Sequence, residues 1–393
     1  MPTNFSTSIF TGTSVAIDDY FVTADSFRQG NLWTWGLNTS GQLGDNTTTQ
    51  RNTPITTFAG GTNWKQVSGG NAHTAAIKTD GTLWTWGANG YGRLGNNTTT
   101  QRNTPVTTFA GGTNWKQVDT GRDHTAAIKT DGTLWNWGDS ANGQLGNNVA
   151  FSTRSTPITT FAGGTDWKQV SAGSRHTAAI KTDGTLWIWG NAGYGRLGDN
   201  TSFFGGRSTP VTTFAGGTNW KQVSCGNFHT AAIKTDGTLW TWGRNHYAQL
   251  GDNTTTNRSI PVTTFAGGTD WKQVKCGYDY VPAIKTDGTL WTWGRNTNGG
   301  LGVNDTNQRN TPVTTFAGGT NWKQVVGGYL RTVAIKTDGT LWTWGLNNVG
   351  QLGDNTTTER NTPVTTFAGG TNWKQVDGII LHTAALTYID DYQ

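Results

Sequence analysis

The stretch His73-Thr-Ala-Ala-Ile-Lys-Thr-Asp-Gly-Thr-Leu-Trp-Thr-Trp-Gly87 decides the fold, because close copies of it recur along the chain. Side chains alternate in polarity on both sides of Asp80-Gly81, and Asp-Gly between two such runs predicts a tight two-residue turn and a β-hairpin. The first Trp of the Leu-Trp-x-Trp-Gly block recurs at intervals of 51, 51, 52, 53, 51 and 51 residues, at Trp33, Trp84, Trp135, Trp187, Trp240, Trp291 and Trp342. Seven copies of one unit therefore account for almost the whole chain.

The composition indicates an all-β protein. Among 393 residues, Glu occurs once, at Glu359, and Met only at Met1, whereas Gly, Thr, Asn and Trp are abundant. Good helix formers are scarce, and turn and strand formers are plentiful. A repeated unit needs its neighbours to bury its faces, so the chain is predicted to form one domain despite its length.

Each unit is predicted to hold four short strands. In order they are Trp-Lys-Gln-Val, His-Thr-Ala-Ala-Ile-Lys, Thr-Leu-Trp-Thr-Trp and Pro-Val-Thr-Thr-Phe, the last opened by a proline that an outer edge tolerates. Seven such antiparallel units favour a β-propeller over a helical solenoid or a leucine-rich horseshoe. The last unit stops after its second strand, and the first unit starts with its third, from Asn31. These two half-blades are predicted to pair and close the ring.

The repeats resemble those of the regulator of chromosome condensation repeat family. The shared pattern is Gly-x-x-His-Thr-x-Ala-Ile-x-x-Asp-Gly-x-Leu-Trp-x-Trp-Gly-x-Asn-x-x-Gly-Gln-Leu-Gly, and it covers about residues 31–388. The resemblance implies a seven-bladed propeller of four-stranded blades. It implies less about function, since the family includes a guanine-nucleotide exchange factor, chromatin binders, ubiquitin-ligase modules and many bacterial and phage proteins. The near identity of the units is most similar to the bacterial and phage members.

The chain ends and the charge restrict the setting. Residues 1–30 differ from the repeats and are predicted to be a tether or an edge strand, residues 31–388 the propeller, and residues 389–393 a tail. No signal peptide or membrane-spanning run is evident in the sequence, so a virion or cytoplasmic location is expected. The formal charge of +5 hints at nucleic acid, yet thirteen of the fourteen lysines recur in Ile-Lys-Thr-Asp and Trp-Lys-Gln-Val. These are predicted to be solvated strand ends, and nucleic acid is not the expected partner.

Residue types that often mark active sites are predicted to be structural here. The 21 Trp could stack on a glycan, but their constant strand positions favour the core. Cys225 and Cys276 are too few for a disulfide framework and are predicted to be small core residues. One repeated slot holds His73, His124, His176, His229 and His382, with Tyr280 and Arg331 in two further units. These histidines are predicted to bond a neighbouring turn, because a metal site would need the imidazoles to point inward together.

No other motif indicates chemistry. The Gly-Asp-Asn-Thr-Thr-Thr loops, as at residues 44–49, lack the spaced carboxylates of a calcium loop and are predicted to be Asx-type turns. No nucleophile-base arrangement, phosphate-binding glycine loop or zinc spacing stands out in the sequence. We therefore expect no catalytic residues, no metal, no cofactor and no enzymatic activity.

The copies differ mainly on one face of the predicted ring, which we term the upper face. It carries the turns between first and second strands and the loops between third and fourth strands. On the opposite, lower face Lys-Thr-Asp-Gly-Thr recurs six times and Ala-Gly-Gly-Thr-Asn/Asp-Trp-Lys seven times. Tyr, Phe and Arg, which anchor recognition surfaces, are frequent at the variable positions, although drift in tolerant loops would also produce variation. The predicted binding residues are Tyr91, Arg93, Arg122, Asp123, Arg175, Tyr194, Arg196, Phe228, Arg244, His246, Tyr247, Tyr278, Tyr280, Arg295, Tyr329 and Arg331.

Three functions remain open on the sequence. The first is a non-enzymatic binding module whose upper face takes a protein or glycan, with residues 1–30 fastening it to a larger assembly. By resemblance to phage members, its predicted setting is a virion surface or tail. The second is a regulatory propeller with guanine-nucleotide exchange or chromatin-binding activity. The third is a purely architectural protein.

Overall fold

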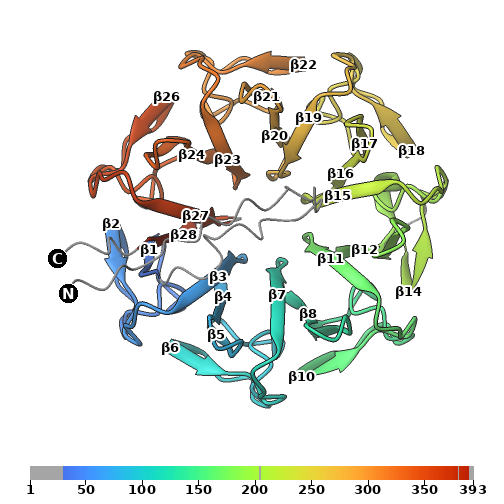
Figure 1. Ribbon diagram of the computed structural model, residues 1–393, viewed down its shortest axis with the longest axis vertical. Helices are drawn as coiled ribbons and strands as arrows, with labels where there is room; N and C mark the ends of the chain where they lie inside the picture. The colour runs from blue at the N-terminus through green and yellow to red at the C-terminus, as the bar shows by residue number, and fades with distance from the viewer. Residues whose placement is uncertain (1–29, 203–204, 379, 389–393) are drawn as a thin grey trace, which may run out of the picture.

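Seven four-stranded antiparallel sheets surround a central channel (Figure 1). The structure is a computed structural model and describes residues 30–202, 205–378 and 380–388. Six sheets use consecutive strands, and the seventh joins β2-β1-β28-β27, which are two strands from each end of the chain. The predicted all-β seven-bladed propeller and its closure by two half-blades are confirmed, with Trp33 paired to Ala385 across the junction.

Each blade repeats four strand positions from the channel outward. The innermost strands are β3 (Trp64–Gly69), β7 (Trp115–Thr120), β11 (Trp167–Ala172), β15 (Trp220–Cys225), β19 (Trp271–Val274), β23 (Trp322–Gly327) and β27 (Trp373–Asp377). The second are β4 (His73–Lys78), β8 (His124–Lys129), β12 (His176–Lys181), β16 (His229–Lys234), β20 (Tyr280–Lys285), β24 (Arg331–Lys336) and β28 (His382–Thr387).

The outer half of each blade is equally regular. The third strands are β1 (Leu32–Gly36), β5 (Leu83–Gly87), β9 (Leu134–Asp139), β13 (Leu186–Asn191), β17 (Leu239–Gly243), β21 (Leu290–Gly294) and β25 (Leu341–Gly345). The outermost are β2 (Arg51–Thr56), β6 (Arg102–Thr107), β10 (Thr153–Thr159), β14 (Gly206–Thr212), β18 (Arg258–Thr263), β22 (Arg309–Thr314) and β26 (Arg360–Thr365). Blade 1 is the closing sheet, and blades 2 to 7 follow in chain order from β3–β6 to β23–β26.

The repeated hairpin has a three-residue loop, so the predicted two-residue turn is wrong. In blade 2 the N–H of Lys78 donates to the C=O of Thr82 at 3.0 Å, which leaves Thr79, Asp80 and Gly81 in the loop. Of these three only Gly81 has a positive φ, +80°. One left-handed residue at the end of a turn is the geometry of a G1 bulge. The Asp80 carboxylate fixes it by accepting bonds from the N–H and hydroxyl of Thr82, at 2.9 and 2.7 Å.

The outermost strand begins before its proline, not at it. Strand β2 starts at Arg51 and contains Pro54, and the prediction that Phe58 ends this strand is also wrong. Phe58 follows the strand and is 66% exposed. Pro54 is tolerated inside the strand because an edge strand leaves one side without a hydrogen-bonded partner.

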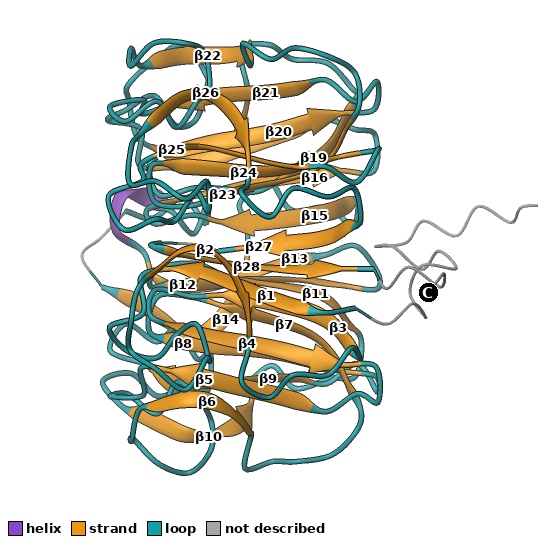
Figure 2. Cartoon of the chain, turned by 90° about the vertical axis from the view of Figure 1, so that its left-hand side faces the viewer, coloured by secondary structure: helices purple, strands orange, loops and turns teal. Residues whose placement is uncertain are grey.

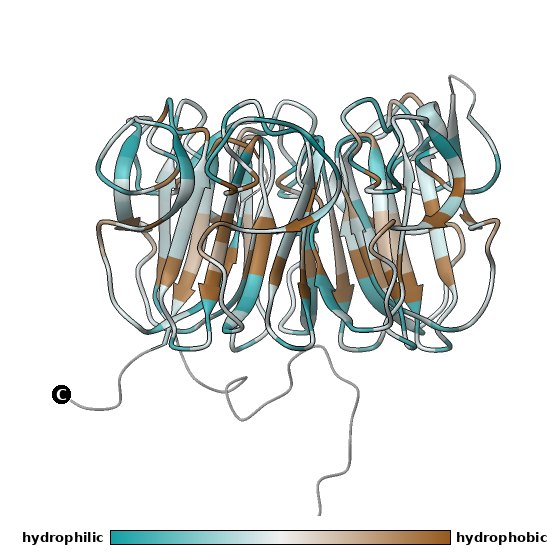
Figure 3. Cartoon of the chain, turned by 90° about the horizontal axis from the view of Figure 1, so that it is seen from above, coloured by the Kyte–Doolittle hydropathy of each residue, from teal (hydrophilic) through white to brown (hydrophobic). Residues whose placement is uncertain are grey.

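The hydrophobic core lies between neighbouring blades. Ile77 and Leu83 of blade 2 pack against Trp115 and Trp137 of blade 3, and six other interfaces repeat this arrangement. The rings of Trp115 and Trp137 meet edge to face with centroids 6.1 Å apart. In each unit two tryptophans are buried and the third is half-buried, which confirms the predicted core role. In Figure 3 the apolar residues lie along the strands, between two more polar faces.

The lysine at the end of each hairpin strand lies over two indole rings. Lys78 Nζ is 4.9 and 4.7 Å from the ring centroids of Trp64 and Trp84, which is cation–π geometry. The same contacts recur at Lys129, Lys181, Lys234, Lys285 and Lys336. These six lysines end their strands, as predicted, but they are half-buried and not fully solvated, because the aliphatic stem and the ammonium cover the tryptophans.

Side chains in two repeated slots join each blade to the next. The amide of Gln66 donates to the C=O of Val118 and accepts from its N–H, both at 3.0 Å, and equivalent glutamines link the inner strands around the channel. The histidines bond a strand threonine of the next blade, at 2.8 to 3.0 Å, in His73–Thr125, His124–Thr177, His176–Thr230 and His382–Thr74. The structural role predicted for the histidines is confirmed for these four, with a strand residue in place of a turn as the partner. The fifth, His229, is equally buried, but neither of its ring nitrogens has a hydrogen-bond partner among the described residues.

The side view shows strands crossing the disc from one face to the other (Figure 2). The short 3-10 helix η2 (Gly193–Gly195) lies on the upper-face side. Cys225, the last residue of β15, and Cys276, two residues after the end of β19, are buried free thiols, which confirms their predicted place in the core. Within the described ranges, no helix is long and apolar enough to traverse a lipid bilayer. The predicted tether, residues 1–30, lies outside the described residues except for Gly30, and so does the predicted tail, residues 389–393.

Candidate functional site

The variable turns and loops meet on one face. In blade 5 the N–H of Arg244, in the loop after β17, donates to the C=O of Phe228, in the turn before β16, at 2.9 Å. In blade 2 the N–H of Ala88 donates to the C=O of Ala72 at 2.8 Å in the same way. Each blade therefore holds its first-to-second turn against its third-to-fourth loop, and side chains from both share the upper face.

Half of the predicted binding residues gather in one sector of this face, over blades 4 to 7. We term this set the aromatic–arginine patch: Tyr194, Phe228, Arg244, His246, Tyr247, Tyr278, Arg295 and Tyr329. Its rings follow one another across four blades, with centroid distances of 5.6 Å for Tyr194–Phe228, 6.3 Å for Phe228–Tyr278 and 4.8 Å for Tyr278–Tyr329. Every pair is edge to face, the arrangement that aromatic quadrupoles favour.

Guanidinium groups cover the faces of these rings. The guanidinium carbon of Arg244 lies 5.6 Å from the ring centroid of Tyr194 and 5.2 Å from that of Phe228. Arg295 covers Tyr247 at 4.8 Å. A guanidinium stacked on a ring keeps its N–H groups at the edge, where they can still pair with a carboxylate or carbonyl.

Asp279 holds the two arginines of the patch, and the sequence prediction missed it. Its carboxylate lies 3.7 Å from the nearest nitrogen of Arg244 and 3.5 Å from that of Arg295, with only 1% of the side chain exposed. Burial raises the pKa of Asp279, although both guanidiniums act in the opposite direction. In the sequence, the signal for Asp279 was an acidic residue in one of several turns that are rich in Arg and Tyr.

Four other predicted residues form a separate cluster over blades 2 and 3. Asp123 pairs with Arg93 at 2.8 Å and with Arg122 at 3.2 Å, and the Arg93 guanidinium lies 5.3 Å from the ring of Tyr91. Arg93 is only 6% exposed, so Tyr91 and Arg122 form most of the accessible surface here. Arg175 is exposed on the blade 4 turn and belongs to neither cluster.

Arg196 is placed beneath the patch. It is 2% exposed, and it donates to the C=O of Gly193 at 2.9 Å and to that of Asn227 at 3.2 Å. Its guanidinium lies 4.8 Å from the ring of Phe228. Burial lowers the pKa of Arg196 to about 9, and Arg175 and Arg244 add to that shift. Arg196 therefore supports the patch and does not form its surface.

Tyr280 and Arg331 are not on the upper surface, so their assignment to the binding face is wrong. Both have no exposed area, because they occupy the buried histidine slot on β20 and β24. The Tyr280 hydroxyl donates to the C=O of Arg331 and accepts from Thr332 Oγ1 at 3.0 Å. Arg331 in turn donates to the C=O of His382. The two side chains replace the interblade histidine contacts.

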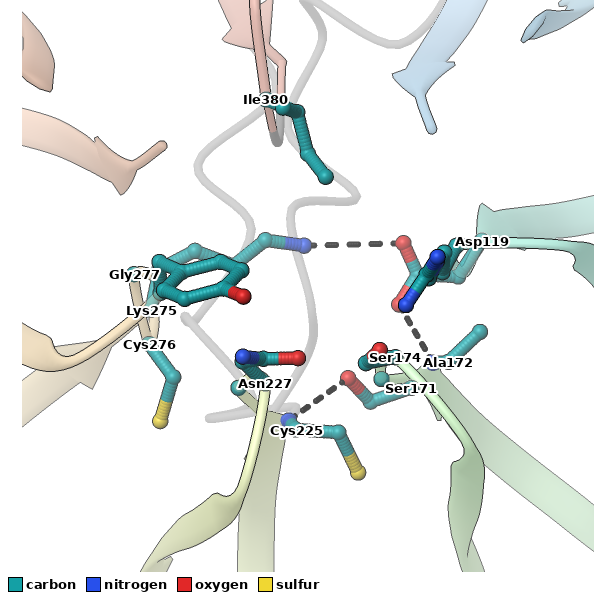
Figure 4. Close-up of a pocket in the computed structure, with 14 residues that line it drawn as sticks. Asp119, Ser171, Ala172, Ser174, Cys225, Asn227, Lys275, Cys276, Gly277 and Ile380 are labelled. Atoms are coloured by element: carbon teal, nitrogen blue, oxygen red, sulfur yellow. Dashed lines mark hydrogen bonds and ion pairs between the residues drawn. The ribbon is translucent and has the colours of Figure 1, made fainter. Parts of the chain in front are cut away.

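A pocket opens at the upper mouth of the channel, beside the patch (Figure 4). Tyr278 lines it together with Lys275, Asp119, Asn227 and Ile380. Lys275 Nζ lies 3.6 Å from Asp119 across the channel, and 3.8 Å from Asp377 of blade 1. Burial raises the pKa of Asp377, with Lys275 opposing the shift. In the sequence, Lys275 could have been singled out because it is the one lysine outside the repeated Ile-Lys-Thr-Asp and Trp-Lys-Gln-Val segments.

The Tyr and Arg side chains of the patch are suited to binding a partner. Burial raises the pKa of the Cys276 thiol to about 12 and that of the Cys225 thiol as well, which keeps both as unreactive thiols. Across the described residues no group of three or more His, Cys, Asp or Glu side chains could hold a metal ion. Asp45 of the oxygen-rich loop instead accepts bonds from Thr47 and Arg51.

Comparison with protein families identifies the repeats. A model of the RCC1-like domain matches residues 152–391, more than half of the chain. Models of the regulator of chromosome condensation (RCC1) repeat match residues 29–77, 80–128, 64–93 and 115–144. The chain belongs to the regulator of chromosome condensation repeat family. The family resemblance stated from the sequence is thus confirmed.

Several members of the family are similar over most of the chain. The ultraviolet-B receptor UVR8 of Arabidopsis thaliana is 33% identical over 338 residues, which cover 84% of this chain and 76% of UVR8. The human E3 ubiquitin-protein ligase HERC2 is 29% identical over 350 residues, which cover 86% of this chain but only 7% of HERC2. The chain therefore spans one small part of HERC2.

Solved structures share the fold. Human WBSCR16 superposes with a TM-score of 0.80 at 20% identity, covering 91% of this chain and all of that one. Prp20p from Saccharomyces cerevisiae, whose structure was described with its binding properties to Gsp1p and histones, gives a TM-score of 0.79 at 17% identity and covers 93% of each chain. At these identities the likeness concerns the fold alone.

Proposed function

We propose that the protein is a regulatory, non-enzymatic binding propeller that takes a protein partner on the aromatic–arginine patch. The observation that carries the proposal is the concentration of eight variable Tyr, Phe, His and Arg residues over blades 4 to 7, on an otherwise repetitive scaffold. Tyr and Arg dominate the binding energy of protein interfaces, because they offer rigid contact area and forked hydrogen bonding. Loops that only tolerate drift have no reason to build one continuous chain of rings.

The relatives support a regulatory setting for this binding role. UVR8 is a receptor and HERC2 an E3 ubiquitin-protein ligase, and the binding of Prp20p to Gsp1p and histones was described with its structure. A receptor, a ubiquitin ligase and a protein described with its binding partners support a regulatory role for this propeller. A virion surface or tail setting, a glycan ligand and a tether in residues 1–30 remain predictions from the sequence that these relatives do not support.

Replacing Tyr278 and Tyr329 with Ala is expected to abolish partner binding with little effect on folding. Both rings are half-buried and touch each other, so the double variant removes the blade 6 and 7 end of the patch. Truncation of an interface hot-spot aromatic costs about 2 kcal/mol or more, so affinity should fall by roughly 30-fold if one of the two rings is a hot spot and by roughly 1,000-fold if both are. The measurement is affinity capture from cells that produce the protein, with quantitative mass spectrometry of wild-type and variant baits.

The matched control for this double variant is Tyr91→Ala, which removes a 46% exposed ring outside the patch. It should retain the partners that the double variant loses. Thermal unfolding of all three proteins should agree within about 1 kcal/mol. Equal recovery of every captured protein by the wild type and the double variant would refute the binding role of the patch.

Guanine-nucleotide exchange is the second candidate, and the family membership favours it. It predicts faster release of a fluorescent GDP from a small GTPase when the protein is added in catalytic amounts. The release rate should fall with the Tyr278 and Tyr329 replacements if the same patch binds the GTPase. Release at the spontaneous rate with a panel of small GTPases would exclude this form of regulation.

A further inference from the structure

The patch sector carries more cationic groups than acidic ones. Arg175, Arg196, Arg244 and Arg295 lie over blades 4 to 6, and the one carboxylate paired with any of them is Asp279. In the described part of the chain no carboxylate lies within ion-pair distance of Arg175 or Arg196. The sector therefore holds four guanidinium charges and one buried carboxylate, which pairs with two of them.

A comparison of two blades shows that this surplus is local. Arg93 and Arg196 occupy the same slot, before the Leu-Gly that ends the loop. Arg93 meets Asp123 of the next blade at 2.8 Å, whereas Arg196 meets Phe228 in the position equivalent to Asp123. Blade 5 thus has an aromatic ring at the position where blade 3 has an acid, and Arg196 beneath it has no carboxylate within ion-pair distance among the described residues.

Like charges of the sector also act on one another. Arg175 and Arg244 both lower the pKa of the Arg196 guanidinium, in addition to burial. An anionic group that approaches the patch would relieve this repulsion, and the edges of stacked guanidiniums are suited to bidentate pairing with carboxylates. Beside them, Asn227 is 5% exposed and lines the pocket, and its Nδ2 has no acceptor among the described residues.

The contacts of the aromatic rings in the patch bear on which anion fits it, a nucleic acid or a carboxylate. Nucleic-acid bases and sugar rings bind by stacking on open aromatic faces. Here Arg244 covers Tyr194 and Phe228, and Arg295 covers Tyr247, while the remaining ring contacts are edge to face. Three of the rings thus carry a guanidinium over one face, and the edges of these guanidiniums fit carboxylates.

We propose that the partner presents an acidic segment, with several Asp or Glu side chains among apolar ones, to the aromatic–arginine patch and the adjoining Arg175. The inference rests on the proposed binding function and specifies the chemistry of the partner. Carboxylates pair with Arg175, Arg244 and Arg295, and the apolar side chains contact Tyr278, Tyr329 and Ile380 at the channel mouth.

The test uses a fluorescein-labelled twelve-residue peptide of Glu and Leu, the same peptide with Gln for Glu, and a twelve-nucleotide single-stranded DNA. Fluorescence anisotropy with the full chain should show binding of the Glu peptide and at least roughly 10-fold weaker binding of the Gln peptide. Arg175→Gln and Arg244→Gln should each weaken the Glu peptide roughly 3- to 10-fold. High salt should weaken it further.

Arg154→Gln is the matched control, because it removes the same charge from an exposed position on β10 of blade 3. It should leave the affinity for the Glu peptide unchanged. Three results would overturn the acidic-segment proposal: equal affinity for the Glu and Gln peptides, no binding of either peptide, or an equal loss of affinity in the Arg154 variant. Tighter binding of the DNA than of the Glu peptide would assign the surface to nucleic acid. The capture experiment with Tyr278 and Tyr329 replaced reports separately on the binding function.

Discussion

Lowering the pH from 6.5 to 4.5 is expected to reduce the free energy of unfolding by roughly 8 kcal/mol through three buried histidines. Burial lowers the pKa of His124, His229 and His382 to about 3, against about 6.5 in the unfolded chain. The native state keeps these imidazoles neutral, and the unfolded state binds the protons. Their contribution is therefore fully present above pH 6.5 and is lost as the pH falls toward 3, at about 1.4 kcal/mol per pH unit and residue.

Two further histidines act in the same direction, and two carboxylates act against it. Burial also lowers the pKa of His73 and His176. Burial raises the pKa of Asp279 and Asp377, so the native state takes up protons there first and recovers part of the loss. Domains are stable by about 5–15 kcal/mol, so the balance predicts acid unfolding between about pH 4 and 5.

The measurement is urea unfolding followed by tryptophan fluorescence at pH 7.5, 6.5, 5.5 and 4.5. His124→Gln, which can keep a side-chain bond to Thr177, should reduce the loss of stability between pH 6.5 and 4.5 by roughly 2–3 kcal/mol. If the free energy of unfolding stayed constant from pH 7.5 to 4.5, the buried histidines would not make the stability depend on pH as predicted.

The fold could be predicted because one physical signal repeats seven times. Alternating polarity around each Asp-Gly gave the hairpins, and the half-unit at each end gave the closure of blade 1. The turn type could not be predicted from Asp80-Gly81 alone, because both a two-residue and a three-residue loop accept Gly at the left-handed position. The position of Lys78 over two indoles depends on tertiary packing between strands that the pattern does not encode.

The candidate site was predicted less completely, because residue type was weighed above strand position. Tyr280 and Arg331 have the side chains of a recognition surface, yet their slot on β20 and β24 buries them. Asp279 was missed although Asp123, in the equivalent turn position, was predicted, and only the structure shows that Asp279 holds two arginines. The aromatic side chains gather over blades 4 to 7 because the circular arrangement of the blades brings neighbouring turns together.

Replacing Trp137 with Ala is expected to destabilise the propeller by about 3–5 kcal/mol, the usual cost of truncating a buried tryptophan. Its side chain has no exposed area, lies between blades 2 and 3, and meets Trp115 edge to face. The indole N–H also donates to the C=O of Arg93 in the preceding blade at 2.9 Å, so the variant would open a cavity and leave a buried carbonyl with one bond fewer. Urea unfolding at pH 7.5 measures the difference.

Phe109→Ala provides the matched aromatic control, because this ring is 65% exposed. Its stability should stay within about 0.5 kcal/mol of the wild type, as is usual for surface substitutions. The pair separates two roles that 21 tryptophans suggest, packing between blades and stacking on a glycan. If Trp137→Ala left the free energy of unfolding unchanged, packing between blades would not be what stabilises the propeller, and glycan stacking by the tryptophans would regain support. If Trp137→Ala lowered it and Phe109→Ala did not, the contacts between blades would be the source of the stability.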